Sequence, residues 1–435
     1  MSPSDRPLRL AIAGLGTVGT GVIRLIERHG PDLATRAGRP LEVVAVSARS
    51  RTRARGIDIS ALGWEDDPVR LATREDVDCV IEVIGGSDGP AKALVEAALE
   101  AGKPVVTANK ALIAHHGQAL AERAEAHGTH LGCEAGVAGA IPVLRALGQG
   151  LAGGSVTRIF GVLNGTCNYI LTRMAATGDD YASVLAEAQR LGYAEADPAF
   201  DVEGTDAAHK LAILAAMAFG TRIDFDGVIT EGIARITAED IQTAAEMGYT
   251  IKLLGLAQRH DGGLEQRVRP CMVAKDTAIG ALPGVTNAVV IEGDTAGTHT
   301  LTGPGAGEGP TAAAVIADVL DVARRRSDPL FARPAAALAP AARLAHGAEH
   351  APYYLRFGLS DRPGALAALA AALGEAGVSI ARMRQNGTQD GEGAPVPVVI
   401  VTHNTQRDAI DTALTRIAAL PVSTAEPVAI RIEQV

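Results

Sequence analysis

The segment DVEGTDAAHKLAIL, residues 201–214, holds the residue types best suited to proton transfer. From Ala207 onward its pattern predicts a buried helix, yet Lys210 lies on the apolar side of that helix. Asp206 lies one turn earlier on the same stripe, because residues three and four positions apart share a helical face. An ammonium group beside a carboxylate in apolar surroundings suits acid–base chemistry, although an ordinary i,i+4 helix pair has the same spacing. The apolar residues that follow on this face favour the catalytic interpretation: Ile213, Leu214 and Met217.

Length and composition limit the number of domains, the kinds of partner and the location that the protein can have. The chain has 435 residues, 47% hydrophobic and 21% charged, which predicts a globular protein of two or three domains. A net charge of −10 argues against nucleic acid or an anionic membrane as the main partner. No apolar run reaches the ~20 residues that span a bilayer, and the N-terminal residues lack an apolar signal core, so we expect a cytoplasmic protein. Four widely spaced cysteines show no metal-ligand pattern and are expected to be buried thiols: Cys79, Cys133, Cys167 and Cys271.

The first ~150 residues alternate between strand and helix patterns. Such alternation predicts a Rossmann-type parallel sheet, doubly wound by helices, over residues 1–150. Strands are expected at residues 8–14, 41–50, 77–86 and 103–110, with a fifth starting at residue 129. Helices are expected at residues 14–30, 89–102 and 111–128.

A glycine-rich turn follows the first predicted strand. Gly14, Gly16 and Gly19 form the pattern G-x-G-x-x-G directly before a predicted helix. In a dinucleotide site these glycines permit a tight turn, close approach of the backbone to a pyrophosphate, and close helix–strand packing. A chance match is the alternative in a glycine-rich chain, but the position after the first strand favours dinucleotide binding.

The end of the second predicted strand indicates which dinucleotide is bound. An acidic residue there usually accepts hydrogen bonds from the ribose of NAD, but this strand ends SARSRTRARG. Arg49, nearest the strand, suits the 2′-phosphate of NADP, although NAD stays possible. For Arg51, Arg53 and Arg55 a solvated basic loop is the favoured interpretation.

The rest of the chain divides into two more regions. Residues 151–335 mix helix and strand patterns and predict an α+β substrate and dimerisation domain, from which a helix at 310–326 returns to close the nucleotide domain. Residues 336–352 are rich in alanine and proline and predict a linker. Residues 353–435 read as strand, D-x-P-G turn, helix, two strands, helix and strand, the βαββαβ pattern of a ferredoxin-like module.

Over nearly its whole length the sequence resembles the homoserine dehydrogenases that carry a C-terminal ACT domain. The segments that carry the resemblance are GLGTVGTGV, KPVVTANKALIA, EAGVAGAIP, GVLNGTCNYILT, LGYAEADPAFDVEGTDAAHKLAIL, GYTIKLLG and GPGAGEGPTAAAV. The first is generic, whereas NGTCNYIL and the run over residues 191–214 are highly specific. One departure is AGAIP at residues 138–142, where the family often has two consecutive glycines; alanine at position 140 is a small change.

The resemblance implies reversible, NAD(P)H-dependent reduction of aspartate 4-semialdehyde to L-homoserine, in the biosynthesis of threonine, methionine and isoleucine. It implies that Lys210 exchanges the proton and that Asp206 holds this lysine. Glu195 and Asp201 would bind the amino group and hydroxyl region of the substrate. Lys110, at the end of a predicted strand, would share proton transfer or bind the substrate carboxylate, with a cofactor phosphate as the alternative.

Further site residues follow from the same resemblance. The cofactor would contact the glycines above and another set: Leu15, Thr17, Val18, Arg49, Lys110, Gly303 and Gly305. A monovalent cation, sodium, would be bound by Glu134, through its side chain or backbone, and by the carbonyl groups of Val137, Gly139 and Ile141. The family also implies a homodimer or homotetramer.

In the ACT domain, the turn and helix start would bind an amino-acid effector, and L-threonine is the natural feedback ligand for this pathway. The residues concerned are Asp361, Arg362, Pro363, Gly364 and Ala365. A purely structural dimerisation domain is the alternative.

Two other functions stay open at this stage. One is an NAD(P)-dependent oxidoreductase that acts on another amino-acid aldehyde or a hydroxy acid. The carboxylates of Glu195 and Asp201 argue against a substrate that lacks an amine. The other is a non-enzymatic amino-acid sensor, which the intact glycines and both lysines argue against.

Overall fold

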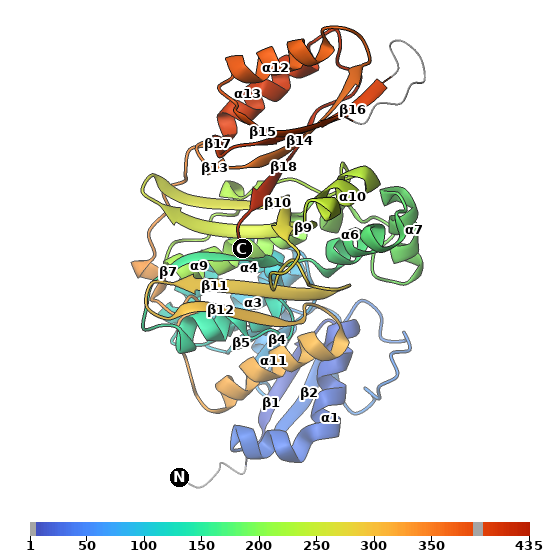
Figure 1. Cartoon of the computed structure of the whole chain (residues 1–435). Coiled ribbons are helices and arrows are strands. Elements are labelled where there is room, and N and C mark those ends of the chain that lie inside the picture. Colours follow the sequence, from blue (N-terminus) through green and yellow to red (C-terminus); the bar gives the residue numbers. More distant parts are fainter. Residues whose placement is uncertain (1–5, 386–394) are drawn as a thin grey trace.

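The computed structural model describes residues 6–385 and 395–435. The chain forms three domains that are stacked in the order of the sequence, with the N-terminal domain at the bottom of Figure 1 and the C-terminal domain at the top. Among the described residues, no helix combines the length and the apolar character needed to cross a bilayer.

The N-terminal region forms a six-stranded sheet of parallel strands, in the order β3-β2-β1-β4-β5-β6. The predicted Rossmann-type fold is therefore confirmed. Sequence analysis missed one strand, β3, because its three residues are too few to show a pattern. The strands are β1 (Leu8–Ala13), β2 (Leu41–Ser47), β3 (Gly63–Glu65), β4 (Cys79–Glu82), β5 (Val105–Thr107) and β6 (Leu131–Gly132).

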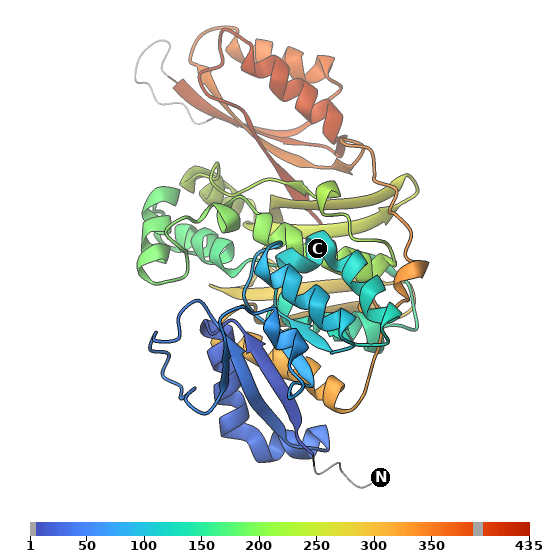
Figure 2. The same ribbon diagram turned by 180° about the vertical axis from the view of Figure 1, so that it is seen from behind.

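Alternate residues of β1 pack into two separate hydrophobic cores, one on each face of the sheet, because successive side chains of a strand point to opposite faces. Leu10 and Ile12 pack with α1 (Thr17–Ala37) and α11 (Glu308–Ala323). Ala11 and Ala13 pack with α3 (Pro90–Glu100) and α4 (Lys110–Ala126). Figure 2 shows α3 and α4 covering the parallel sheet from behind. The helix α11 thus packs on the first domain, and it begins two residues before the helix expected at 310–326.

The middle region forms a mixed sheet that shields the predicted catalytic helix. This helix, α9 (Thr205–Phe219), packs against β7 (Val156–Val162), β9 (Tyr249–His260) and β10 (Gly263–Ala274). Beyond β7 lie β11 (Thr286–Gly293) and β12 (Gly297–Pro304). Sequence analysis did not predict β12 as a strand, because its glycine-containing residues up to Pro304 resemble a turn. The remaining helices here include α6 (Gly165–Thr177), α7 (Tyr181–Arg190), α8 (Ala199–Val202) and α10 (Ala238–Glu246).

The C-terminal region has the predicted βαββαβ order. Its elements are β14 (Tyr353–Ser360), α12 (Ala365–Glu375), β15 (Ile380–Gln385), β16 (Pro395–Thr402), α13 (Arg407–Ala418) and β18 (Val428–Glu433). The two helices cover one face of the four strands, at the top of Figure 1. Apolar residues of both helices and of the strands form a core of their own.

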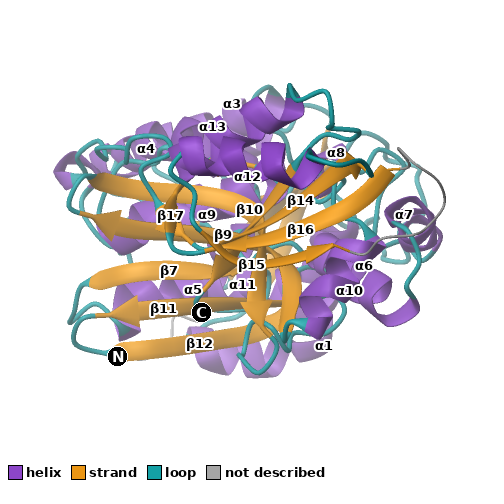
Figure 3. Cartoon of the chain, turned by 45° about the horizontal axis from the view of Figure 1, so that its top comes forward, coloured by secondary structure: helices purple, strands orange, loops and turns teal. Residues whose placement is uncertain are grey.

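The last strand joins this domain to the middle one. β18 pairs with β14 on one side and, in parallel, with β10 on the other, so that a single sheet runs through both domains (Figure 3). The predicted linker at 336–352 is also attached: the N–H of Arg222 donates to Ala339 O at 2.9 Å, and the N–H of Leu264 donates to Ala342 O at 2.7 Å. Hydrogen bonds thus fix the C-terminal domain at two places.

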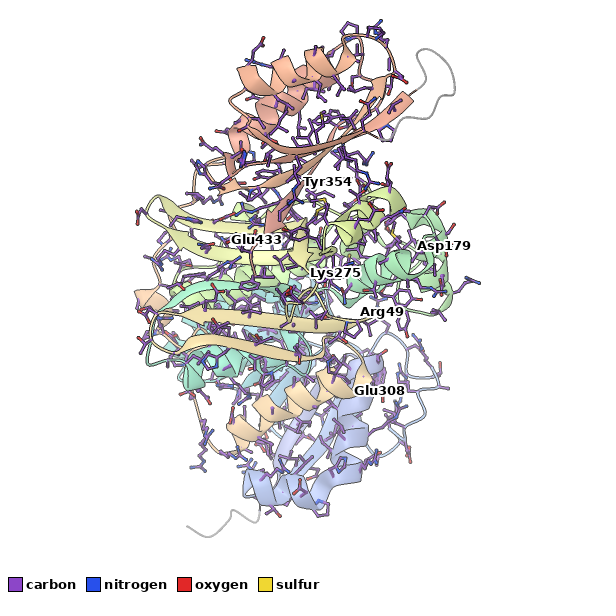
Figure 4. All side chains as sticks on the ribbon, viewed as in Figure 1. Arg49, Asp179, Lys275, Glu308, Tyr354 and Glu433 are labelled. Carbon is purple, nitrogen blue, oxygen red and sulfur yellow. The ribbon has the colours of Figure 1, made fainter. Side chains whose placement is uncertain are left out.

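Buried charges line the junction between β10 and β18. The fully buried Arg267 donates to Glu433 and, at 2.6 Å, to Glu265. Burial opposes ionisation of Glu265, but a hydrogen bond from His260 and the charge of Arg267 outweigh it and lower the pKa of that carboxyl. Figure 4 labels Glu433 at this junction, below Tyr354 of the C-terminal domain. Glu433 also pairs with Arg158 of β7 and with Arg431 of β18, so a network of buried charges connects the two domains.

Candidate active site

A cavity of about 630 Å³ lies between the parallel sheet and the middle domain. Its lining includes the glycine turn, the end of β5, the loop before α6 and one face of α9. Residues from these four places are Thr17, Lys110, Asn164 and Lys210. The cavity therefore lies beyond the carboxyl ends of the parallel strands, where α/β sheets usually bind ligands.

Two lysines share one carboxylate in this cavity. Lys210 Nζ donates to Asp206 Oδ2 at 2.7 Å and to the carbonyl oxygen of Leu163 at 2.7 Å. Lys110 Nζ lies 3.1 Å from the other oxygen of Asp206, Oδ1. Lys210 is 8% exposed, so it lies buried among the residues of this cluster. The predicted pair of Asp206 and Lys210 is thus part of a cluster of three charged groups, in which Lys110 comes from the N-terminal domain.

Asn164 belongs to this cluster although sequence analysis did not single it out. Its side-chain Nδ2 donates to Asp201 Oδ1 at 2.7 Å and to Asp206 Oδ2 at 2.8 Å. Its Oδ1 accepts from the N–H of Cys167 at 2.8 Å and so caps α6. An asparagine before a helix signals such a cap, but its second role depends on contacts that only the tertiary fold creates.

The two carboxylates of the cluster differ in their electrostatics. Burial opposes ionisation of Asp206, but the ammonium groups of Lys210 and Lys110 outweigh it and lower the pKa of Asp206. Burial raises the pKa of Asp201, and the neighbouring Asp206 adds to this effect. Asp206 therefore stays anionic at neutral pH and can hold both lysines. The stability that its low pKa contributes is lost only when the pH falls through that lowered value.

The open side of the cavity carries the remaining predicted substrate residue. Glu195 lines the cavity on the exposed segment between α7 and α8. Leu191, Tyr193 and Phe200 are large apolar residues that remain exposed along the same segment. Glu195 and Asp201 thus reach the cavity from neighbouring positions, one at its rim and one more deeply buried.

The glycine turn has the geometry that a dinucleotide requires. Gly14 has φ +106°, and a Cβ there would lie 2.4 Å from Val83 O. A Cβ on Gly19 would lie 1.9 Å from Gly14 O, so the helix packs too closely for a side chain. Gly16 faces open space, at the start of α1, where no side chain caps the free N–H groups. These groups fit a pyrophosphate, so the turn is suited to the cofactor.

The other predicted cofactor residues lie at different distances from the cavity. Thr17, Val18 and Gly305 line it, while Leu15 is buried beside the turn. Gly303 lies within β12 and is not part of the cavity lining. A Cβ on this glycine would lie 3.2 Å from the side chain of Ile141. The loop after β2 carries Arg49, which is exposed and labelled in Figure 4.

Arg55 departs from the solvated position that we expected. Its Nε donates to Leu15 O at 3.2 Å, and its guanidinium also donates to Ser50 O. The basic loop after β2 is thereby folded onto the glycine turn. Arg55 is committed to the backbone, which leaves Arg49 as the more accessible cation near the strand end.

The predicted cation loop is a compact turn beside the cavity. Ala138 and Gly139 both have φ +57°, and the oxygens of the Glu134 side chain accept from the N–H groups of Leu144 and Arg145 at 3.0 Å. Burial, reinforced by Asp318, raises the pKa of Glu134 to about 7. Within residues 134–141, no hydrogen bond reaches the carbonyl oxygens of Val137 and Gly139, whereas that of Ile141 accepts from Val143. Across the described ranges, no cluster of three or more histidine, cysteine or acidic side chains has metal-binding geometry.

The predicted effector residues lie together in the C-terminal domain. Residues 361–365 line a cavity of about 620 Å³ with Gln385 and Val396. α12 begins at Ala365, after Gly364 with φ +89°, and no side chain of the described residues caps its first N–H groups. The turn thus presents free backbone donors to this cavity.

A nucleotide-binding Rossmann domain, a cavity with a shared lysine–carboxylate cluster and an ACT-like module together define an NAD(P)-dependent oxidoreductase of amino-acid metabolism. Comparison with known families agrees: the homoserine dehydrogenase NAD-binding domain matches residues 14–134, the homoserine dehydrogenase domain matches 142–320 and the ACT domain matches 353–422. The chain belongs to the homoserine dehydrogenase family.

Individual relatives are similar along their full length. The homoserine dehydrogenase of Pseudomonas aeruginosa is 43% identical and covers 99% of both chains. That of Mycobacterium tuberculosis is 45% identical over 93% of this chain and 92% of its own. The crystal structure of a homoserine dehydrogenase from Thiobacillus denitrificans has a TM-score of 0.92 at 39% identity, and it covers 99% of both chains.

Asn164 provides a test of the charge cluster. Asn164→Ala should raise KM for homoserine by about tenfold, because Asp201 and Asp206 lose their shared donor. The measurement is steady-state kinetics, alongside thermal unfolding. Asp180→Ala is a matched control, since Asp180 caps α7 through the N–H of Ser183, away from the cavity. If both variants raise KM equally, the effect comes from helix capping and not from the cluster.

Proposed function

We propose that Lys210 exchanges the proton in the reversible reduction of aspartate 4-semialdehyde to homoserine. The observation that carries this proposal is the buried Lys210 ammonium, held in the cavity by Asp206 and by Leu163 O. When bound, the reduced nicotinamide supplies a hydride to the aldehyde carbon. Lys210 gives a proton to the oxygen in this direction and accepts it back in homoserine oxidation.

Lys110 and Asp206 orient the reacting groups. Asp206 cannot donate a proton at neutral pH, because its lowered pKa keeps it ionised, so its role is to fix both ammonium groups. The Lys110 side chain is 29% exposed and that of Lys210 is 10% exposed. The more accessible Lys110 therefore binds the carboxylate of the substrate, and the more deeply buried Lys210 carries the proton.

The substrate ammonium binds to the remaining carboxylates. Glu195 and Asp201 both line the cavity, and a cationic amine is the group of the substrate that they attract. Asn164 fixes Asp201 through its hydrogen bond at 2.7 Å. With lysines on one part of the lining and carboxylates on another, the cavity complements a zwitterionic amino acid.

The proton role of Lys210 has a direct test. Lys210→Ala should lower kcat for homoserine oxidation by ~10²–10⁴-fold, the usual contribution of an acid–base group, while NADPH affinity barely changes. Stopped-flow kinetics and fluorescence titration measure the two effects. Lys252→Met serves as a control, because Lys252 is a buried lysine that binds Asn168 and Leu282 O outside the cavity. Near-normal turnover by folded Lys210→Ala would assign the lysine to structure.

The cofactor preferred by this site is NADP, with NAD as a weaker alternative. Support comes from the end of β2, where no acidic residue follows Ser47 and the exposed Arg49 has no hydrogen-bond partner among the described residues. An arginine in this place suits a 2′-phosphate and an acidic residue suits the free ribose.

Arg49 can be tested with both cofactors. Arg49→Ala should raise Kd for NADPH by about tenfold and leave Kd for NADH nearly unchanged, because only NADPH carries the 2′-phosphate. Arg53→Ala is the control on the same loop and should affect neither. Equal losses for both dinucleotides would rule out phosphate recognition by Arg49.

A monovalent cation, sodium, occupies the turn at 134–141. Carbonyl oxygens suit such an ion, and those of Val137 and Gly139 have no donor within this turn. The carboxylate of Glu134 already accepts two backbone N–H groups and its carbonyl oxygen accepts one from Val137, so either part of this residue contributes a remaining lone pair. Sodium should raise Tm above that in tetramethylammonium at equal ionic strength; an unchanged Tm contradicts the site.

L-threonine is the effector of the C-terminal domain. Its carboxylate fits the free N–H groups at the start of α12, and Asp361 in the same cavity suits its ammonium. Binding there biases the enzyme towards a less active arrangement, with a coupling of ~1–3 kcal/mol. The enzyme acts as a cytoplasmic homodimer or homotetramer, and light scattering that finds only monomer would contradict the assembly.

Threonine regulation is testable by point substitution. Truncation is unsuitable, because it would remove β18 and leave Arg267 without Glu433. Asp361→Ala should weaken threonine inhibition by about tenfold at unchanged basal kcat. Glu375→Ala is the control, since Glu375 lies at the far end of α12 and, among the described residues, pairs only with the exposed Arg416. If Asp361→Ala is inhibited like the wild type, threonine binds elsewhere; if the wild type does not respond, the domain serves another ligand or is structural.

A further inference from the structure

Asn287 on β11 is a buried side chain that the cluster of charges does not use. It is 1% exposed and lines the same cavity as Lys210. Neither its Nδ2 nor its Oδ1 has a hydrogen-bond partner among the described residues. A buried amide without partners costs free energy, so native proteins rarely keep one unless it acquires partners in another state.

The surroundings of this amide contain glycines in place of side chains. A Cβ on Gly305 would lie 2.1 Å from Asn287 Nδ2, and a Cβ on Gly165 would lie 3.4 Å from its Oδ1. Gly139 also packs closely on Gly305, since a Cβ on Gly139 would lie 2.6 Å from the carbonyl carbon of Gly305. Glycine backbone therefore packs directly against the amide where Gly305 and Gly165 lie, and no side chain of these two residues intervenes.

This part of the cavity lies between helix α11 of the nucleotide side and the charge cluster around Asp206. Gly305 lines the cavity beside the returning helix α11, and Gly165 follows Asn164 of the charge cluster. A flat ring fits against glycine surfaces, and a primary amide presents an NH₂ donor group beside a carbonyl acceptor. The complementary group on a nicotinamide cofactor is its carboxamide, which also presents a donor group and an acceptor group.

We infer that Asn287 forms its hydrogen bonds only in the cofactor-bound enzyme, where Nδ2 donates to the carboxamide oxygen and Oδ1 accepts from the carboxamide N–H. Asn287 thus fixes the rotation of the nicotinamide ring above the substrate. This inference rests on the proposed cofactor site. It assigns to Asn287 a recognition role that neither the glycine turn nor the lysines can fulfil, because they contact the phosphates and the substrate.

The first test measures stability without cofactor. Asn287→Leu should keep Tm of the cofactor-free enzyme within about 2 °C of the wild type, because no hydrogen bond is lost. Asn168→Leu is the matched control: Asn168 is also 1% exposed, but its amide donates to Gly284 O at 2.8 Å and accepts from Lys252 at 2.8 Å. This control should lower Tm by about 3 °C or more. A similar loss in Asn287→Leu and in the smaller Asn287→Ala would overturn the inference.

The second test uses the 3-acetylpyridine analogue of NADPH, in which a methyl group replaces the carboxamide nitrogen. Wild type should bind NADPH about tenfold more tightly than this analogue, because Oδ1 loses its donor. In Asn287→Ala and Asn287→Leu the ratio of the two Kd values should fall towards one, while Asn168→Leu keeps the wild-type ratio. A ratio that persists in both Asn287 variants overturns the inference, and so does a rise confined to KM for homoserine. If the wild type binds neither NADPH nor NADH, the proposed cofactor site itself is wrong.

Discussion

One buried carboxylate, Asp206, holds together two lysines that come from different domains. Lys210 belongs to α9 of the middle domain, and Lys110 begins α4 of the nucleotide domain. The same two helices also meet beside this cluster, where Nε2 of His209, directly before Lys210 in α9, lies 3.3 Å from His115 Nε2. Burial, reinforced by the neighbouring His115, lowers the pKa of His209 to about 4, so the imidazoles meet without charge repulsion at neutral pH. The cavity keeps its shape because these contacts fix one domain against the other.

The charges of the cavity follow from this arrangement. Asp206 is outnumbered by the ammonium groups, whereas Asp201 and Glu195 are available to a cation. A zwitterionic substrate can therefore be bound with its carboxylate and its ammonium at separate places, which fixes its orientation. Asn164 connects the lysine-bound Asp206 with the more available Asp201, since its side-chain amide donates to both carboxylates.

Local patterns in the sequence were enough to predict the elements that carry the chemistry. The apolar stripe around Lys210 and the glycine spacing at residues 14–19 depend on neighbours within a few turns, and both have the expected geometry. β12 escaped prediction because its exposed, glycine-containing residues read as a turn. The roles of Asn164 and Asn287 could not be read from the chain, because their partners are brought close only by the fold.

The position of β18 has a consequence for how the protein is made. This strand follows the whole C-terminal domain in the sequence, yet it pairs with β10 and contributes a carboxylate to the buried Arg267 of the middle domain. Because synthesis proceeds from the N-terminus, β10 must wait with an open edge and an incompletely paired cation until residues 428–433 emerge. A chain released before β18 is made could not close this sheet, so it would lack a finished middle domain and would be recognised by proteases and chaperones.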